Sequence, residues 1–352
     1  PEKFRKFNEM NEGEKEKMEG KVTVRVSELL ETAKGCMLRE GVPEEEAEII
    51  ANSLVQADRR GVFSHGVVCL PRYAGLMRSG MMRTAESHEV TRRLGAVEVW
   101  DGKRSSGQVL GHRAMTRAME MAKECGVGIV AVYHGNHFGA GAYYAMLAQA
   151  QGMIGIAAST GSPTMAPWGG MDKCLGNNPV AVAVPAREHG PVVLDMAQSV
   201  VAFGRVTNLK KQGIQEVPEG WCLDSRGKPT VKMDEVASVA PMAGYKGYGI
   251  AVMVDILSGI LFGGATGARA DDMQEGPGMI FAALNVEAFS DKDAFYGALD
   301  ARIDEMKNAR CVEGVEKIYM PGEPENDRMR ASEEEITIIR EIMDEVNALA
   351  GN

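Results

Sequence analysis

Apolar and polar residues at the start of the chain repeat with the period of a helix. From Val24 to Arg39 the apolar positions recur every three or four residues, and Gly41 follows as a stop signal. A second helix is predicted to run towards Arg59, because Pro43 suits a first helical position and three glutamates follow it in the first turn. The N-terminal part is therefore predicted to be helical.

The middle of the chain alternates between helical segments and short apolar runs. The β-branched run Val127–Tyr133 is typical of a buried strand, and it lies between predicted helices at 108–124 and 140–150. Further strands are predicted at 89–100, 153–158, 179–185, 191–196, 279–286 and 315–319, and further helices at 70–78, from 247, at 291–307 and at 332–350. This pattern predicts an α/β (α+β) fold.

A chain of 352 residues is long enough for two domains. We expect a largely helical, dimerising domain built from residues 1–95 together with 290–352, and an α/β domain at residues 96–289 that binds cofactor and substrate. Hydrophobic residues make up 45% and charged residues 25%, the composition of an ordinary globular protein.

Charge and cysteine content narrow the class of partner. The net charge of −10, with no basic stripe beyond Lys210-Lys211, argues against nucleic acid and against an anionic membrane. The longest apolar segment, Tyr248–Ala265, contains Asp255 and is short for a spanning helix, so we expect a buried helix of a soluble protein. Six scattered cysteines without a Cys-x-x-Cys pair, and no signal-like N-terminus, indicate the cytoplasm.

The common motifs of enzyme active sites do not occur. No Gly-x-Gly-x-x-Gly links a strand to a helix, and there is no phosphate loop, no His-Glu-x-x-His and no Gly-x-Ser-x-Gly. A Rossmann dinucleotide site of the usual kind is therefore not predicted.

The glycine-rich stretch Gly135–Gly141 carries a candidate catalytic histidine, His137, between a predicted strand and a predicted helix. An imidazole titrates near pH 7, so His137 could exchange a proton with a substrate hydroxyl. Two other interpretations stay open: a helix-start residue bonded to backbone, and a metal pair with His134.

Three further positions carry candidate chemistry. Ser64-His65-Gly66 is either a proton relay or a plain turn. Lys246 lies between glycines before a helix, which suits a phosphate or carboxylate site as well as an exposed turn. Asp195 ends a predicted strand and suits a ribose hydroxyl, although Asp195 or Ser199 could equally cap the next helix.

Six motifs in order resemble one family. They are Ser64-His65-Gly66, Asn136-His137-Phe138-Gly139, Met165-Ala166-Pro167-Trp168-Gly169-Gly170, Leu175-Gly176-Asn177-Asn178-Pro179, Asp195-Met196-Ala197 and Tyr245-Lys246-Gly247-Tyr248-Gly249. Together they resemble the malate/L-lactate dehydrogenase family of the second, non-Rossmann type. That family includes L-sulfolactate and ureidoglycolate dehydrogenases, 2,3-diketo-L-gulonate reductase and piperideine-2-carboxylate reductase. The resemblance runs from about Val24 past Pro321-Gly322-Glu323, nearly the whole chain.

The resemblance implies a function and a set of site residues. It implies an NAD(P)-dependent oxidoreductase for a small anionic 2-hydroxy or 2-keto acid, with the cofactor on a non-Rossmann sheet, in a homodimer. It implies His137 and His65 as acid/base residues, with His137 favoured for proton transfer, and NAD is favoured over NADP. It further implies cofactor contacts from Gly161 or Ser162, Asp195, Met196, Ala197, Lys246, Gly322 and Glu323, and we expect substrate contacts from Ser64, Arg72 and Asn178. No metal ligand is expected.

Two departures from the family pattern concern the substrate. Cys69 stands where family members carry an arginine suited to a carboxylate, and Arg72, one helical turn on, is the candidate replacement. Asn177 stands where a threonine is usual. Rival functions are therefore an NADPH-dependent imine or diketo-acid reductase of the same family, a catalytically silent nucleotide-binding protein, and a metal-dependent hydrolase using His134 and His137.

Overall fold

The computed structural model describes residues 20–85, 88–272 and 274–351, so the first nineteen residues of the predicted helical domain lie outside it. Contacts divide the chain into two compact units. The helical unit comprises the chain up to Gly75, Pro185–Val192 and the chain from Ser290 on, and the sheet unit comprises Leu76–Val184 and Val193–Phe289. Residues 76–95, expected with the helical part, belong to the sheet unit because the strand that starts at Glu89 pairs within its sheet.

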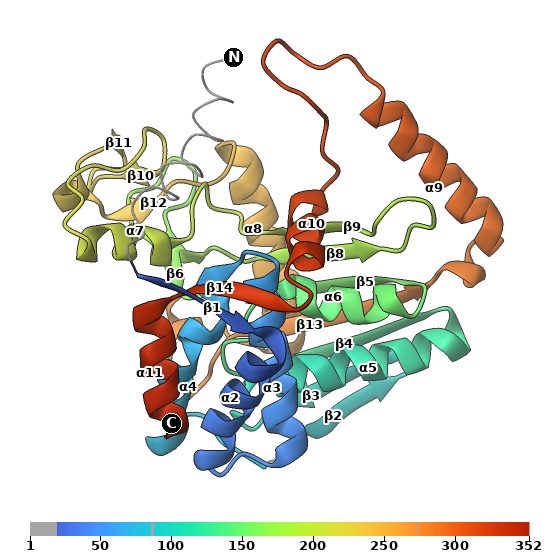
Figure 1. Ribbon diagram of the computed structural model, residues 1–352, viewed down its shortest axis with the longest axis horizontal. Coiled ribbons are helices and arrows are strands. Elements are labelled where there is room, and N and C mark those ends of the chain that lie inside the picture. The colour runs from blue at the N-terminus through green and yellow to red at the C-terminus, as the bar shows by residue number, and fades with distance from the viewer. Residues whose placement is uncertain (1–19, 86–87, 273, 352) are drawn as a thin grey trace. The chain divides into compact units, whose positions relative to one another are not determined.

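The helical unit is built from both ends of the sequence (Figure 1). Its elements are β1 (Lys21–Arg25), α2 (Val26–Arg39), α3 (Glu44–Arg59), α9 (Lys292–Lys307), α10 (Glu323–Ala331), β14 (Glu335–Ile339) and α11 (Arg340–Ala350), and α4 (Leu70–Arg78) runs across its boundary. β1 and β14 form an antiparallel pair. Helix α11 packs on α2, whose side chains Leu29, Ala33 and Met37 are buried.

A mixed seven-stranded sheet in the order β2-β3-β4-β13-β5-β8-β9 forms the centre of the sheet unit. Its strands are β2 (Glu89–Leu94), β3 (Val97–Asp101), β4 (Val127–Tyr133), β5 (Met153–Ser159), β8 (Val180–Val184), β9 (Val192–Met196) and β13 (Met279–Asn285). β3 and β4 are parallel, whereas β13 runs antiparallel to both β4 and β5. Helices α5 (Gly107–Cys125) and α6 (Gly141–Ala150) pack on this sheet around the buried Tyr144 and Phe281.

A smaller five-stranded sheet lies in the same unit, in the order β11-β10-β12-β6-β7. Its strands are β6 (Pro163–Met165), β7 (Leu175–Gly176), β10 (Cys222–Leu223), β11 (Pro229–Thr230) and β12 (Ser238–Val239), and it is accompanied by α7 (Phe203–Lys211) and α8 (Tyr245–Ser258). Met165, Cys222 and Val239 form its core with Ala251 of α8.

Helix α8 is more exposed than the sequence indicates. The apolar segment that contains it was expected to be buried, yet Met253 is 51% exposed and Leu257 46%. Within the described residues, Tyr245–Phe262 is also the one helical segment whose length and composition would allow it to cross a membrane. The expectation of a buried helix was wrong, because only Gly247, Ala251, Val254 and Ser258 of α8 are buried.

Three other local predictions were wrong, and two helices were missed. Residues 24–25 and 335–339 were assigned to helices but are strand, because each segment finds a partner strand in the other. Residues 315–319 were predicted as a strand but have no regular structure. Helices α7 and α10 were not predicted, since both are short and polar.

Candidate functional site

The candidate residues fall into two groups, one in each unit. Ser64, His65, Arg72, Gly322 and Glu323 lie in the helical unit, and His137, Gly161, Ser162, Asn178, Asp195, Met196, Ala197 and Lys246 lie in the sheet unit. Of the six motifs, Ser64-His65-Gly66 thus lies in the helical unit and the other five lie in the sheet unit.

The Ser64-His65 pair lies in a tight turn between α3 and α4, made of two short 3-10 helices, Phe63–His65 and Val67–Cys69. Ser64 Oγ and His65 Nδ1 are hydrogen-bonded at 2.8 Å. Burial lowers the pKa of His65, and the charge of the exposed Arg72 lowers it further. Ser64 and His65 therefore meet in one turn, and the charge of Arg72 in α4 acts on the His65 ring, so His65 is a neutral imidazole that can take or share a proton.

Cys69 faces the protein. Its Sγ donates to the carbonyl oxygen of Ser64 at 3.5 Å, and burial raises the pKa of the thiol. Cys69 is thus an uncharged group that supports the turn and cannot bind a carboxylate as an arginine would. With cysteine at position 69, the guanidinium of Arg72 is the positive charge that acts on His65.

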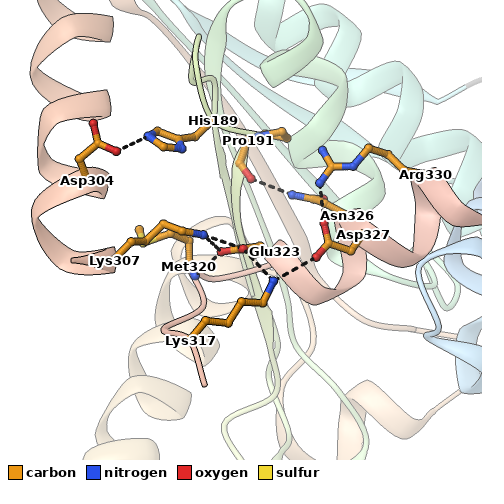
Figure 2. Close-up of polar contacts among 10 residues, drawn as sticks. All are labelled: His189, Pro191, Asp304, Lys307, Lys317, Met320, Glu323, Asn326, Asp327 and Arg330. Carbon is orange, nitrogen blue, oxygen red and sulfur yellow. Dashed lines mark hydrogen bonds and ion pairs between the residues drawn. The ribbon is translucent and has the colours of Figure 1, made fainter. Parts of the chain in front are cut away.

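Glu323 is held by lysines at the start of α10 (Figure 2). Lys307 Nζ donates to both carboxylate oxygens, at 2.6 and 2.7 Å, and the amide of Met320 donates to Oε2 at 2.9 Å. Burial alone would raise the pKa of Glu323, but these hydrogen bonds and the charges of Lys307 and Lys317 hold it below its usual range. A carboxylate has about four acceptor positions, so about one remains for a ligand hydroxyl.

The His137 turn is anchored on both sides. Before it, the buried amide of Asn136 donates to the carbonyl oxygens of Arg104 and Ser105, at 2.8 and 3.3 Å. After it, the hydroxyl of Tyr144 donates to the carbonyl oxygen of Phe138. The turn also lies against the start of α5, where a Cβ on Gly107 would come within 2.5 Å of the His137 carbonyl oxygen. The half-buried His137 therefore stands on a fixed backbone.

His134 has a different environment from His137. Its Nδ1 lies 3.1 Å from Asp101 Oδ1, and its backbone has a φ of 52°. Within the described ranges, no three histidine, cysteine or acidic side chains gather as metal ligands would. The metal-pair interpretation of His134 therefore gains no support from these residues.

Asp195 stands at the end of β9 and contacts the helix that follows the His137 turn. Its Oδ2 accepts from the amide of Ala142 at 2.8 Å, in the first turn of α6. The sequence left open whether this acid caps the next helix in the chain or binds a ligand. The helix that it caps is α6, which lies earlier in the sequence, so Asp195 connects β9 to the segment carrying His137.

Asn178 fixes the Gly161 loop. Its buried side chain accepts from the Gly161 amide at 3.0 Å and donates to Ala251 O and Asp255 Oδ1, both at 2.8 Å. These bonds occupy the amide within the protein. The structure shows an anchoring role for Asn178, and the substrate contact expected of it remains a prediction.

Backbone hydrogen bonds connect the remaining candidates of the sheet unit. The Gln198 amide donates to the Asn177 carbonyl oxygen at 2.7 Å, and the Met242 amide donates to the Gln198 carbonyl oxygen at 2.8 Å. The strand end that carries Asp195, Met196 and Ala197 is thereby joined to the Asn178 loop and to the turn before Lys246. This cluster combines a carboxylate, an exposed ammonium and a helix N-terminus.

Supporting residues were missed by the sequence interpretation. Asp255 is brought to Asn178 only by folding, and the role of Asn136, which the motif already contained, depends on bonds to Arg104 and Ser105 that form only in the folded chain. Asp58, buried at the end of α3, did leave a signal, since it lies on the apolar face of a predicted helix, four residues after Leu54.

Comparison with known proteins decides the family. The family model for malate/L-lactate dehydrogenase matches residues 24–347. The chain belongs to this family. It is 38% identical over 327 residues to a malate dehydrogenase of Pyrococcus abyssi, covering 88% of this chain and 89% of that protein. It is 38% identical over 293 residues to an L-sulfolactate dehydrogenase of Methanocaldococcus jannaschii, covering 81% and 84%.

Solved structures of the family share this fold. The malate dehydrogenase of Pyrococcus horikoshii OT3 superimposes with a TM-score of 0.86 at 34% identity, over 95% of this chain and 96% of that one. The family resemblance inferred from six motifs is thus confirmed, as is the mixed α/β architecture.

Proposed function

We propose that this chain is an NAD(P)-dependent dehydrogenase that interconverts a small 2-hydroxy acid and its 2-keto acid. Family membership across nearly the whole chain carries the proposal, and relatives are named for malate and for sulfolactate. The anchored histidine turns supply the acid/base groups that such a reaction needs.

In the proposed reaction, His137 takes the hydroxyl proton of the substrate when the alcohol is oxidised and returns it in the reverse direction. Bound NAD(P) supplies the hydride chemistry. His65, neutral and bonded to Ser64, contacts the substrate, and the guanidinium of Arg72 attracts its carboxylate. The anchored backbone of the His137 turn keeps the imidazole in one place throughout.

The sheet unit fits a nicotinamide cofactor chemically, although it lacks the usual glycine fingerprint. At the start of α8 the exposed Lys246 makes no ion pair within the described residues, and the helix N-terminus adds backbone N–H groups. We infer a non-Rossmann site, supported by a sheet in which β13 runs antiparallel to both of its neighbours. The proposed cofactor contacts of this unit are Gly161, Ser162, Asp195, Met196, Ala197 and Lys246, and the family resemblance adds Gly322 and Glu323 of the helical unit.

NAD is the favoured cofactor in this proposal. Asp195 and Glu323 carry carboxylates, which accept hydrogen bonds from the hydroxyl groups of a ribose and repel the negatively charged 2′-phosphate of NADP. Relatives of both kinds exist: one from Escherichia coli is named ureidoglycolate dehydrogenase (NAD(+)), and one from Chromohalobacter salexigens is named (2R)-3-sulfolactate dehydrogenase (NADP(+)).

The proposed location is the cytoplasm. The six free cysteines support it, because reduced thiols persist there.

A substrate panel tests the proposed function. Oxaloacetate, pyruvate, sulfopyruvate, 2,3-diketogulonate and a cyclic imine are offered with NADH and with NADPH, and absorbance at the nicotinamide band is followed. We expect turnover of at least one 2-keto acid, with NADH preferred. Turnover of the imine or the diketo acid with NADPH alone would favour the rival reductase. Tight binding of NAD(P)H without turnover of any compound would contradict the proposal and favour a silent nucleotide-binding protein.

We also propose that the chain forms a homodimer through α8. The exposed side chains Ile250, Met253, Ile256 and Leu257 recur at helical spacing, and Ile260 and Leu261 continue them beyond the helix. Monomers seldom leave such a continuous apolar surface in water. A second copy of the chain would cover it.

A charged substitution tests the dimer. Met253→Glu is expected to convert the dimer to a monomer, because it places a carboxylate in a desolvated interface. Analytical ultracentrifugation measures the mass. The control is Leu94→Glu, at a side chain 81% exposed on β2, which should leave the mass unchanged. A monomeric wild type, or a dimeric Met253→Glu protein, would refute this interface.

A further inference from the structure

Asp58 is a buried acid in the last turn of α3, and the proposed mechanism does not use it. Its side chain is 4% exposed, and within the described residues its one hydrogen-bonded partner is the amide of Val67, which donates to Oδ2 at 2.8 Å. Burial raises the pKa of Asp58 to about 7, against the opposing effect of that hydrogen bond. Burying a carboxyl group is unfavourable unless it makes a specific contact. The contact that Asp58 makes is with the turn that carries His65.

The next residue of that turn, Gly66, lies directly against the carboxylate. A Cβ built on Gly66 would come 1.8 Å from Oδ1 of Asp58 and 2.1 Å from its Cγ. The backbone of Gly66 has a φ of −88° and a ψ of −153°, which other residues also adopt. Glycine is therefore required here by the position of the Asp58 carboxylate and not by the backbone angles. The Ser-His-Gly motif and Asp58 form one packed unit.

The contact with Asp58 fixes the backbone next to His65, and so the position of the Cα atom that carries the His65 side chain. Asp58 touches Gly66 and bonds Val67, the two residues that follow His65. On the other side, Ser64 is bonded to the His65 ring, and the Cys69 thiol donates to the Ser64 carbonyl oxygen. The backbone of the turn is thus held from α3 on one side and from Cys69 on the other.

We propose that Asp58 is a positioning residue for His65, acting through its contact with Gly66 and its hydrogen bond from Val67. The proposal rests on the proposed function, in which His65 contacts the substrate. The effect is due to shape and hydrogen bonding, so an asparagine at this position can replace the acid. Its side chain has nearly the same shape, and its Oδ1 can accept from the Val67 amide.

The test compares Asp58→Asn, Asp58→Ala, Gly66→Ala and the double variant that combines the two alanine substitutions. The measurements are kcat, KM, the Kd for NADH and the ring signal of His65 in ¹³C-histidine-labelled protein, assigned with His65→Gln. In Asp58→Asn, kcat should stay within about threefold of wild type and the ring signal should be unchanged. In Asp58→Ala and in Gly66→Ala the ring signal should move and kcat should fall about tenfold to a hundredfold, with the Kd for NADH unchanged.

The double variant gives the sharpest result. The methyl group that Gly66→Ala introduces clashes with Asp58 but fits the space that Asp58→Ala leaves, so the double variant should be less impaired than the product of the two single effects predicts. If the fold-changes of the two single variants simply multiplied in the double variant, the two residues would act independently of each other. That result would overturn the proposal. Wild-type kcat and an unmoved ring signal in Asp58→Ala would overturn it too, as would an Asp58→Asn protein as impaired as Asp58→Ala.

The wild-type protein and Asp58→Asn keep the test decisive even where the alanine variants do not fold. The amide signal of Val67 should titrate with Asp58 in wild type and lose that titration in Asp58→Asn. His65, Cys69 and Tyr73 are the other titratable groups at the turn, with the charged Arg72, and they remain in the variant. An amide signal that titrates identically in both proteins would refute the contact. These signals need no substrate, so they distinguish failure of the positioning role from failure of the proposed activity.

Discussion

Replacing His137 with alanine is expected to lower kcat at least about a hundredfold while leaving the Kd for NADH within about twofold of wild type. The imidazole is the proposed proton acceptor for the substrate hydroxyl, and no other side chain of that turn replaces it. The turn itself should survive, because its anchors are the Asn136 amide and the Tyr144 hydroxyl. Steady-state rates with the substrate found in the panel and NADH fluorescence titration measure the two quantities.

His134 provides the matched control three residues earlier in the same turn. Its ring pairs with Asp101 at 3.1 Å, so His134→Gln should keep kcat within about threefold of wild type. A near-normal rate in His137→Ala would contradict the proton-transfer role of His137. The same substitution would then be made at His65. Equal losses in both variants would point to damage of the turn and contradict a specific role for His137.

Asp58→Asn is expected to make the folded protein more stable relative to wild type as the pH rises. The pKa of Asp58 is about 7 in the folded protein, against an ordinary value of 3.8. Well below pH 3.8 the carboxyl is protonated in both states, so it carries no ionic penalty. As the pH rises to 7, the unfolded chain releases this proton and the folded protein retains it, so wild type loses up to about 4 kcal/mol of unfolding free energy. Asparagine has no such proton.

Urea unfolding at pH 5 and pH 8.5 measures this effect. The difference in unfolding free energy between Asp58→Asn and wild type should increase by about 2–4 kcal/mol between the two pH values. Glu48→Gln, at an exposed carboxylate on the same helix, is the control and should change by less than about 0.5 kcal/mol. A pH-independent difference for Asp58→Asn would show that the carboxyl titrates normally.

The sequence predicted those elements whose signals are local. Strand β4 occupies Val127–Tyr133 as expected, because a β-branched apolar run follows the helix stop at Gly126. Strands β1 and β14 were missed, since each is stabilised by the other and Thr23 bonds Thr337 from 314 residues away. Residues 315–319 include the β-branched Val315 and Ile318, but within the described residues no strand pairs with them, and Lys317 Nζ lies 3.6 Å from Glu323 Oε1.

The residues of the candidate site also differ in how far the sequence alone could predict their roles. Ser64, His65 and Arg72 are close in the sequence, and in the structure Ser64 bonds His65 while the charge of Arg72 acts on the His65 ring. The roles of the residues that fix those turns were not visible in the sequence, because Asn136 and Asp58 act on segments that folding brings to them. For the same reason the sequence could not show that the Asn178 amide is occupied by Gly161 and Asp255.

The division of the chain into units has a consequence for the order of folding during synthesis. The sheet unit is complete once β13 has emerged from the ribosome, whereas the helical unit needs β14 and α11, which come last. Helices α2 and α3 are made before them and pack on each other, yet the side of α2 that packs on α11 stays uncovered until α11 arrives. The helical unit is therefore expected to fold late, and its first helices are the segments that most need chaperones while the chain is being made.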